Sequence, residues 1–539
     1  MLATRGKVLT FQKSRRLRIA LLSSAALAIS LPVIAHADEL SDLKKEVQAL
    51  NARLAQLEKE KSQPAAQETL VRQQDAKVIA NTSAGDVPAT PKTENSDNVL
   101  GVLQQPIMLY HGHDTSLHIY GIIEGTISGW SNQPNANGNG KPSWATGFQT
   151  AWFSGNRLGF DVDHALTSAE KFGLPDLKVI AKLEAEFESP SGNMDTPGVL
   201  FNRDAWIGFQ SPELGKLTFG RQNTVTRDFT QTWGDPYGTP FVSLNEGGYS
   251  NVNNFKQIIF YSASSTTTRN DSGIVWKKSF LGDHMIVGLD YSFGSQGVGG
   301  SGNGGIGNMP LLDGGGGSPG QFKVGSNQAI SLAYNNLEVG GGQLSWNVNY
   351  NRSSCGNFGD DHCDASDPSA GNYVNQNTNQ AFLTGGTYVF DGWRVGAGYI
   401  RYIAQQHTNT GNLGDRKDNV WIVDGTIPVR PISKDLDLYW GAWEAFGHNS
   451  ALYAGNNLVV LPFFISTANS TKTVNGSRIN ATVSLMYHLD KQTDIYFAYD
   501  YQLGRGGWSH TLFDTQGNGG GPSLRAETTG IGTGVRLKF

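Results

Sequence analysis

The sequence predicts an all-β fold, a 16-stranded antiparallel transmembrane β-barrel, preceded by a short N-terminal α-helical coiled coil. Three observations predict it. The chain begins with an export signal, and from residue 116 onward short segments alternate polar and apolar residues. The connections between those segments also alternate between short and long. Barrels of bacterial outer membranes have short turns at one end and long loops at the other.

Residues 1–37 have the order of a secretory signal peptide. Six positive charges and no acid precede an apolar run, 19–34, which ends at Ala35-His36-Ala37. We therefore expect cleavage before Asp38. The alternative is an uncleaved membrane anchor, but the run is shorter than the roughly 20 residues that span a bilayer. Removing the six charges changes the formal net charge from −5 to −11, so a nucleic-acid partner is not expected.

Residues 38–61 show the heptad spacing of a coiled coil. Alternate intervals of three and four residues separate Leu40, Leu43, Val47, Leu50, Leu54 and Leu57, which occupy the core positions of a left-handed coil. A lone amphipathic helix remains the alternative, because fewer than three heptads are present. Residues 62–114, rich in Gln, Ala, Thr, Ser and Pro, are expected to be a flexible linker.

The barrel is expected to occupy residues 115–539. Fifteen of its strands lie at 116–130, 156–164, 177–188, 201–209, 215–221, 284–293, 328–335, 342–351, 380–390, 393–402, 419–429, 435–446, 477–488, 493–503 and 528–539. The sixth strand in chain order falls within 256–280, where both 256–262 and 272–280 alternate. A barrel with both ends in the periplasm needs an even number of strands, so either one of the two is a loop or both form one bulged strand. Asp391-Gly392 is the dipeptide that a two-residue hairpin prefers.

The remaining signals point away from an enzyme or a metal protein. Cys355 and Cys363 lie in one predicted outer loop, and we expect a disulfide there because the exported location is oxidising. His111, His113 and His118 lack the further ligands of a metal site and are interpreted as ordinary polar residues. No catalytic motif is identified, and we expect no catalytic residue, no metal and no cofactor.

Several segments resemble the general, non-specific porin family of Gram-negative bacteria, from about residue 115 to the end. They are Leu117-His-Ile-Tyr-Gly-Ile-Ile-Glu-Gly, Ser154-Gly-Asn-Arg-Leu-Gly-Phe, Leu177-Lys-Val-Ile-Ala-Lys-Leu-Glu, Phe201-Asn-Arg-Asp-Ala-Trp-Ile-Gly-Phe, Leu217-Thr-Phe-Gly-Arg-Gln and Gly534-Val-Arg-Leu-Lys-Phe539. The resemblance implies a homotrimer in the outer membrane, in contact with lipid and lipopolysaccharide. The terminal Phe539 would be the signal read by the barrel-assembly machinery.

The resemblance also implies a water-filled channel for passive diffusion of small hydrophilic solutes and ions. Its third loop, here about Gln222–Asn254, would fold into the pore and form a charged constriction. The basic wall candidates are Arg157, Arg203, Arg221 and Lys182, with Lys277 dependent on the sixth strand. The acids of the loop are Asp228, Asp235 and Glu246. Asp228 and Asp235 are expected to oppose the three arginines across the gap.

The chain departs from that family in its N-terminal coil, which would lie in the periplasm and contact a periplasmic or cell-wall component. The coil is similar to that of sugar-specific porins with eighteen strands, so a saccharide-selective channel is an alternative. Two further alternatives are an outer-membrane barrel hydrolase and a purely structural tether.

Overall fold

The computed structural model describes residues 106–134, 142–247, 261, 269–293, 326–354, 373–408, 411–412, 414–454, 457–460, 466–467, 473–508 and 527–539. The expected signal peptide and coiled coil, the linker as far as residue 105, and Cys355 and Cys363 lie outside these residues. Among the described helices, none combines the length and the hydropathy that a membrane span requires.

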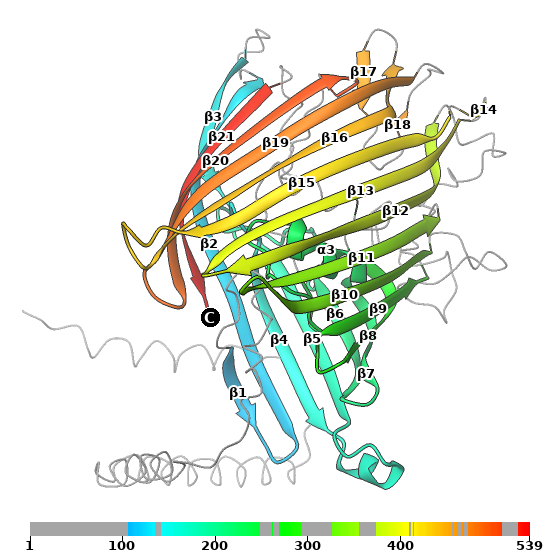
Figure 1. Cartoon of the computed structure of the whole chain (residues 1–539), viewed down its shortest axis with the longest axis vertical. Coiled ribbons are helices and arrows are strands. Elements are labelled where there is room, and N and C mark those ends of the chain that lie inside the picture. The colour runs from blue at the N-terminus through cyan, green and yellow to red at the C-terminus, as the bar shows by residue number, and fades with distance from the viewer. Residues whose placement is uncertain are drawn as a thin grey trace, which may run out of the picture. The chain divides into compact units, whose positions relative to one another are not determined.

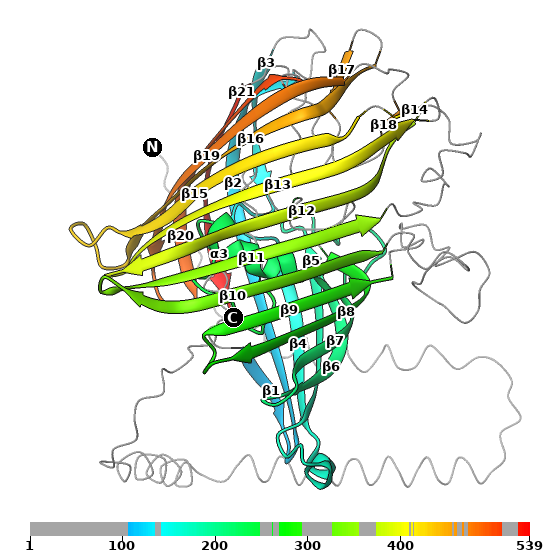
Figure 2. The ribbon, with the colours of Figure 1, turned by 45° about the vertical axis from the view of Figure 1, so that its right-hand side comes forward.

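Sixteen antiparallel strands form a closed ring, as the sequence predicts (Figures 1 and 2). In ring order they are β2 (Thr115–Pro134), β4 (Asn156–Ala165), β5 (Lys178–Phe187), β6 (Asp204–Ser211), β7 (Gly215–Asn223), β8 (Arg269–Phe280), β9 (Met285–Ser292), β10 (Asn327–Val339), β11 (Gly342–Ser354), β12 (Tyr373–Phe390), β13 (Trp393–Thr408), β15 (Arg416–Pro428), β16 (Leu436–Ala454), β19 (Thr473–His488), β20 (Thr493–Gly506) and β21 (Glu527–Lys538). The last strand returns to the first, with Ile122 opposite Lys538. This closure leaves no free edge in the ring.

The sixth strand is β8, which corresponds to the predicted 272–280 and begins slightly earlier. It pairs with β7 and β9, with Lys216 opposite Lys277 and Phe280 opposite Met285. The ring therefore contains sixteen strands, and the eighteen-stranded architecture is not what this chain adopts.

Five shorter strands lie outside the ring order: β1 (Ile107–His111), β3 (Pro142–Gln149), β14 (Gly411–Asn412), β17 (Asn457–Val460) and β18 (Ser466–Thr467). Two of them correct the sequence-based boundaries. β1 falls in the expected linker but pairs with β2 across a turn in which Gly112 N–H donates to Thr115 O, 2.8 Å. β3 falls in the expected loop 131–155 and pairs with the second half of β2. The hairpin extends well beyond the predicted strand end.

Alternation along the strands separates two surfaces. Apolar side chains such as Ile127, Ile207 and Trp421 point outward and are 56–60% exposed. Their neighbours on the opposite face, such as Lys182, Glu184 and Asp424, are almost fully buried inside. A barrel with an apolar outside and a charged interior is the arrangement of a membrane-spanning channel wall rather than of a soluble sandwich.

Turns and the C-terminus fix the register of this ring. Asp391 and Gly392 have φ angles of 47° and 81°, as the predicted two-residue turn requires. Where the C-terminus after β21 meets β2, Phe539 N–H donates to Gly121 O, 3.0 Å, and Gly121 N–H donates to Phe539 O, 2.8 Å. A side chain at Gly121 would collide with the Phe539 ring, so glycine is required for this contact.

Candidate functional site in the barrel interior

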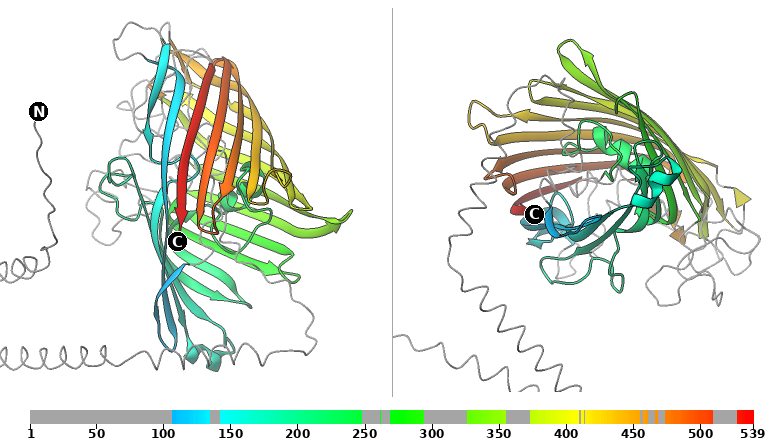
Figure 3. Two further views of the ribbon diagram at one scale, coloured as in Figure 1. Left: turned by 90° about the vertical axis from the view of Figure 1, so that its left-hand side faces the viewer. Right: turned by 90° about the horizontal axis from the view of Figure 1, so that it is seen from below.

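The segment after β7 folds inside the ring of strands rather than outside it. It contains one helix, α3 (Val225–Gly234), all of whose residues are buried. Thr224 caps the helix by accepting a hydrogen bond from Arg227 N–H, 3.1 Å, which satisfies one free donor of the first turn. The helix contacts β9 to β13 and β15, and the view from below shows it within the barrel (Figure 3). We call residues 224–247 the inner loop.

Trp233 packs the C-terminal end of α3 against strands β12 and β13 of the barrel wall. Its ring packs over two glycines of neighbouring strands, Gly385 and Gly398, where a Cβ would lie 2.4 and 1.9 Å from ring atoms. Its Nε1–H donates to Asn347 Oδ1, 2.9 Å. Glycine at both positions therefore creates the recess that receives the indole.

Three wall lysines fasten the inner loop through its acids. Lys277 Nζ lies 2.5 Å from Asp228 Oδ2, in a pair that is 3% exposed on each side. Lys216 and Lys182 share Glu246, at 2.5 and 3.5 Å. Burial disfavours the ionised form of Glu246, but the charge of Lys216, followed by those of Lys182 and Lys277, outweighs it and holds the pKa of Glu246 well below its usual range. The loop is thus held by buried ion pairs.

The predicted arginines lie on the same side of the interior but have other partners. Arg203 pairs with Glu184 and Glu186 of β5, and Arg157 Nη1 lies 3.8 Å from Glu184. Arg221 Nε–H donates to the carbonyl of Asn202, 2.7 Å. Arg157 and Arg203 thus pair with acids of β5 rather than with the loop aspartates, which they were expected to oppose across the gap.

Arg227, in α3, adds a further cation to this side. Burial and the like charge of Arg203 lower the pKa of Arg227 to about 10. Arg227 therefore lies close to a second guanidinium group, with the carboxylates of Asp228 and Asp204 also near it. Sequence alternation does not identify Arg227, because it lies on a helix within a loop.

Asp235 lies at the far end of α3, where its Oδ1 accepts a hydrogen bond from Tyr237 N–H, 2.9 Å, and its backbone carbonyl faces the wall. Arg394 donates from Nη2 to Asp235 O, 3.0 Å, and from Nη1 to Asp424 Oδ1, 2.7 Å. Arg394 is thus a second anchor of the inner loop, and it was missed because nothing in its strand distinguishes it from other inward cations.

Beyond Asp235 the inner loop crosses to the opposite wall. The Tyr237 ring stacks on Tyr439 of β16, with centroids 4.5 Å apart, and its hydroxyl donates to Ser484 Oγ of β19, 2.5 Å. It also meets Phe153, from the connection between β3 and β4, edge to face at 4.5 Å. The loop therefore spans the interior from the lysine wall at β7 and β8 to β16 and β19.

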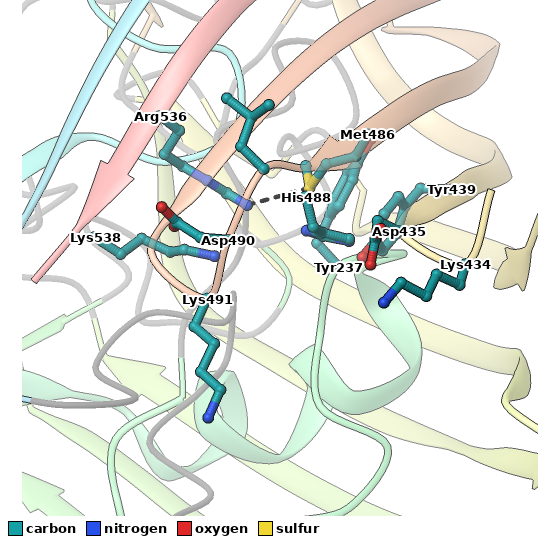
Figure 4. A pocket seen from close by; sticks show the side chains of 11 residues that line it. Tyr237, Lys434, Asp435, Tyr439, Met486, His488, Asp490, Lys491, Arg536 and Lys538 are labelled. Atoms are coloured by element: carbon teal, nitrogen blue, oxygen red, sulfur yellow. Dashed lines mark hydrogen bonds between the residues drawn. The ribbon is translucent and has the colours of Figure 1, made fainter.

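Below Tyr237 a cavity of about 620 Å³ opens at the end of the barrel that carries the short turns (Figure 4). It is lined by Tyr237, Lys434, Asp435, Tyr439, Met486, His488, Leu489, Asp490, Lys491, Arg536 and Lys538. Asp494, which lies behind this lining, holds Arg536 at 2.7 Å, Lys538 at 3.0 Å and His488 at 2.7 Å. Water and ions entering here would meet a polar, mostly charged surface. Within the described residues, no cluster of three or more His, Cys, Asp or Glu is suited to a metal ion.

Known proteins with similar sequences or folds include porins. An outer membrane porin protein of Bordetella pertussis is 28% identical over 188 residues, which cover 33% of this chain and 43% of that protein. The alignment thus spans less than half of the relative's length. The solved structure of an anion-selective porin from Comamonas acidovorans matches 79% of this chain and all of its own chain, with a TM-score of 0.50 and 16% identity, and so has the same fold.

The family model of the Gram-negative porins matches residues 104–507, which include most of the barrel described above. The match, the closed ring of sixteen strands and the charged interior agree: this chain belongs to the Gram-negative porin family.

Proposed function

We propose that the protein forms a water-filled channel for the passive diffusion of small hydrophilic solutes and ions across the outer membrane. The observation that carries this proposal is the barrel interior, where charged side chains line the strands while the apolar ones face outward. Such an interior stays hydrated and discriminates by size and charge rather than by chemistry on the solute.

The inner loop sets the narrow part of this channel. Its acids Asp228 and Glu246 pair with lysines of the wall, whereas Arg157, Arg203 and Arg227 lie near one another beside the acids of β5. Charges of both signs therefore meet at the constriction and would set up a field across it. A transverse field of this kind orients dipolar solutes and disfavours apolar ones. The basic candidates Arg157, Arg203, Arg221 and Lys182, and the acidic candidates Asp228, Asp235 and Glu246, serve the constriction in this proposal, with Lys216, Lys277 and Arg394 added as anchors.

The protein assembles as a homotrimer, with lipid and lipopolysaccharide around it and the coil of residues 38–61 in the periplasm. Family membership supports the trimer, and the heptad pattern supports a coil that adds to it. Phe539 is the assembly signal, a role supported by its position at the closure with β2. Cys355 and Cys363 form the predicted disulfide of an outer loop.

Swelling of liposomes that contain the purified protein tests the diffusion proposal. Neutral sugars of increasing size should enter at rates that fall steeply with size, and sugars of equal size should enter at similar rates. Entry of one saccharide far above its size class would favour the saccharide-selective alternative. Turnover of the liposome lipid would reveal a hydrolase, and an absence of any entry would leave only a structural tether.

A further inference from the structure

The connection between β3 and β4 leaves the sheet and enters the barrel. β3 and β4 both pair with β2, where Gln149 is opposite Thr126 and Arg157 is opposite Ile122. Three residues of β2 separate these two pairs, but the segment that joins β3 to β4 has seven residues, 150–156, between them. The extra residues cannot stay in the plane of the sheet, as in an enlarged β-bulge.

The extruded residues are directed inward. Ala151 is 3% exposed, and Trp152, Phe153 and Ser154 are fully buried. The Trp152 ring lies on the backbone of Gly532 in β21, where a Cβ would approach it to 2.3 Å. Two large aromatic side chains therefore occupy the interior at a place where an ordinary barrel strand would supply wall backbone only.

Glu124 holds the segment in place. One of its oxygens, Oε1, accepts hydrogen bonds from the backbone N–H of Trp152, 2.6 Å, from that of Phe153, 3.0 Å, and from the hydroxyl of Tyr496, 2.7 Å. The two N–H groups have left the β-ladder, and an unsatisfied buried N–H costs about as much as a lost hydrogen bond. Glu124 is itself fully buried, so its carboxylate acts as a fixed acceptor for the turn.

Asn156 closes the base of the same turn. Its side chain accepts from Glu124 N–H, 2.5 Å, and donates to Thr150 O, 3.2 Å. The hydroxyl of Ser189, from another connection, lies 3.0 Å from both the Thr150 and the Glu124 carbonyl oxygens and can donate to either. The segment is thus fastened at its start, its middle and its end.

The inward segment meets the inner loop. Phe153 contacts Tyr237 edge to face at 4.5 Å and Tyr496 at 4.4 Å, and the Arg536 guanidinium lies 5.3 Å from the Phe153 ring centre. Tyr237 is the residue by which the inner loop reaches the far wall. The two inward segments, far apart in sequence, therefore meet through aromatic rings, and Tyr237 and Arg536, which contact Phe153, also line the cavity of Figure 4.

We propose that residues 150–155 are a second constricting segment of the channel, that Phe153 is a size-determining residue, and that Glu124 is the positioning residue that holds it. The proposal rests on the channel function proposed above. In this proposal the buried Phe153 ring, packed against Tyr237, occupies interior space beside the inner loop, which would restrict bulky solutes and leave small ions free to pass beside it.

Single-channel conductance in planar bilayers and the size limit in liposome swelling test this proposal. Phe153→Ala and Glu124→Ala should both raise the conductance and admit larger sugars, because each removes or releases the ring. Glu124→Gln should stay near the wild type, since its amide oxygen can accept the same N–H groups. Phe148→Ala is the matched control, because Phe148 lies in the same hairpin but points outward and is 56% exposed.

Wild-type conductance and size limit in both Phe153→Ala and Glu124→Ala would overturn the proposal while leaving the channel function intact. A wild-type protein without conductance would instead refute the channel function itself. If Glu124→Ala fails to assemble, Phe153→Cys provides an independent test. A charged thiol reagent should reduce its current and leave the wild type unchanged, whereas a current that does not respond would place residue 153 outside the solute path.

Discussion

At the residue scale, the buried pair Lys277–Asp228 fastens the inner loop at α3, with both side chains 3% exposed. Asp228→Asn would leave the ammonium group of Lys277 buried beside a neutral amide. Breaking a buried pair by removing one partner costs about 3–5 kcal/mol. We therefore expect a clear drop in the temperature at which the folded barrel is lost on heat-modifiability gels, together with larger and noisier single-channel steps.

Asp391→Asn is the matched control for that variant. The Asp391–Arg430 pair has its atoms 3.1 Å apart, but its side chains are 55–65% exposed. Exposed pairs contribute about 0–1 kcal/mol, and Asn is tolerated at the positive φ of this turn. Equal losses of stability in the two variants would show that Asp228 does not anchor the loop.

Glu246 gives the anchoring a predictable pH dependence. Its pKa in the folded state is lowered from an ordinary value of 4.5, since Lys216, Lys182 and Lys277 outweigh the effect of burial. A group of this kind contributes stability that is fully present above the unfolded pKa and is lost as the pH falls through the folded pKa. The difference in thermal stability between the wild type and Glu246→Gln should therefore be constant above about pH 6 and shrink below about pH 4.5. A difference that grows on acidification would contradict this sign.

Arg227 tests the electrostatic role of the interior. Arg227→Gln removes a cation that lies beside Arg203, so the reversal potential in a salt gradient should shift toward cation preference. Stability should change little, because the lost attraction to Asp228 and Asp204 is offset by relief of the buried charge and of its repulsion from Arg203. An unchanged reversal potential with unchanged conductance would place Arg227 away from the ion path.

The sequence predicts which side chains are charged and inward more reliably than it predicts their partners. Lys182 and Glu184 follow from strict alternation in β5. Arg203 precedes β6 between two polar neighbours, and its pairing with Glu184 depends on the register between strands. Partners of this kind are set by tertiary structure, which one sequence does not contain.

At the element scale, strands with short turns are predicted well and irregular connections are not. The Asp391-Gly392 turn fixes its hairpin through two positive φ angles that few residues adopt. The stretch 131–155 reads as one long polar loop, yet it contains β3 and the inward segment. The apolar Ala151-Trp152-Phe153 signals burial, but Trp144 and Phe148 of the same stretch are exposed, so apolar character alone does not identify the inward segment.

The predicted coiled coil of residues 38–61 should stabilise the trimer without being required for it. Fewer than three heptads give too small a seam to hold chains together alone, so the coil should add to an oligomer made by the barrel. Deleting Asp38–Lys61 should leave a trimer on non-denaturing gels that dissociates at a lower temperature than the wild type. A monomeric product would show instead that the coil drives assembly.

At the scale of the whole molecule, membership in the Gram-negative porin family confirms the predicted outer-membrane location. Alternation along the chain, together with the even number that a ring with both chain ends on one side needs, predicts sixteen strands, and the ring confirms sixteen against the alternative of eighteen. The arrangement of the segments inside the ring cannot be predicted from the sequence in the same way. The inner loop, the segment 150–155 and their aromatic contact depend on packing across the interior between residues more than eighty positions apart.

The proposed channel function depends on a hydrated, narrowed path through the barrel. The current carried by single molecules of the purified protein in a planar lipid bilayer tests this most directly. We predict stepwise, voltage-independent conductance with a linear current–voltage relation, since the narrow part is built from wall charges and fastened loops rather than from a mobile gate. A protein that inserts into the bilayer as a folded barrel and yet gives no conductance steps would contradict the account.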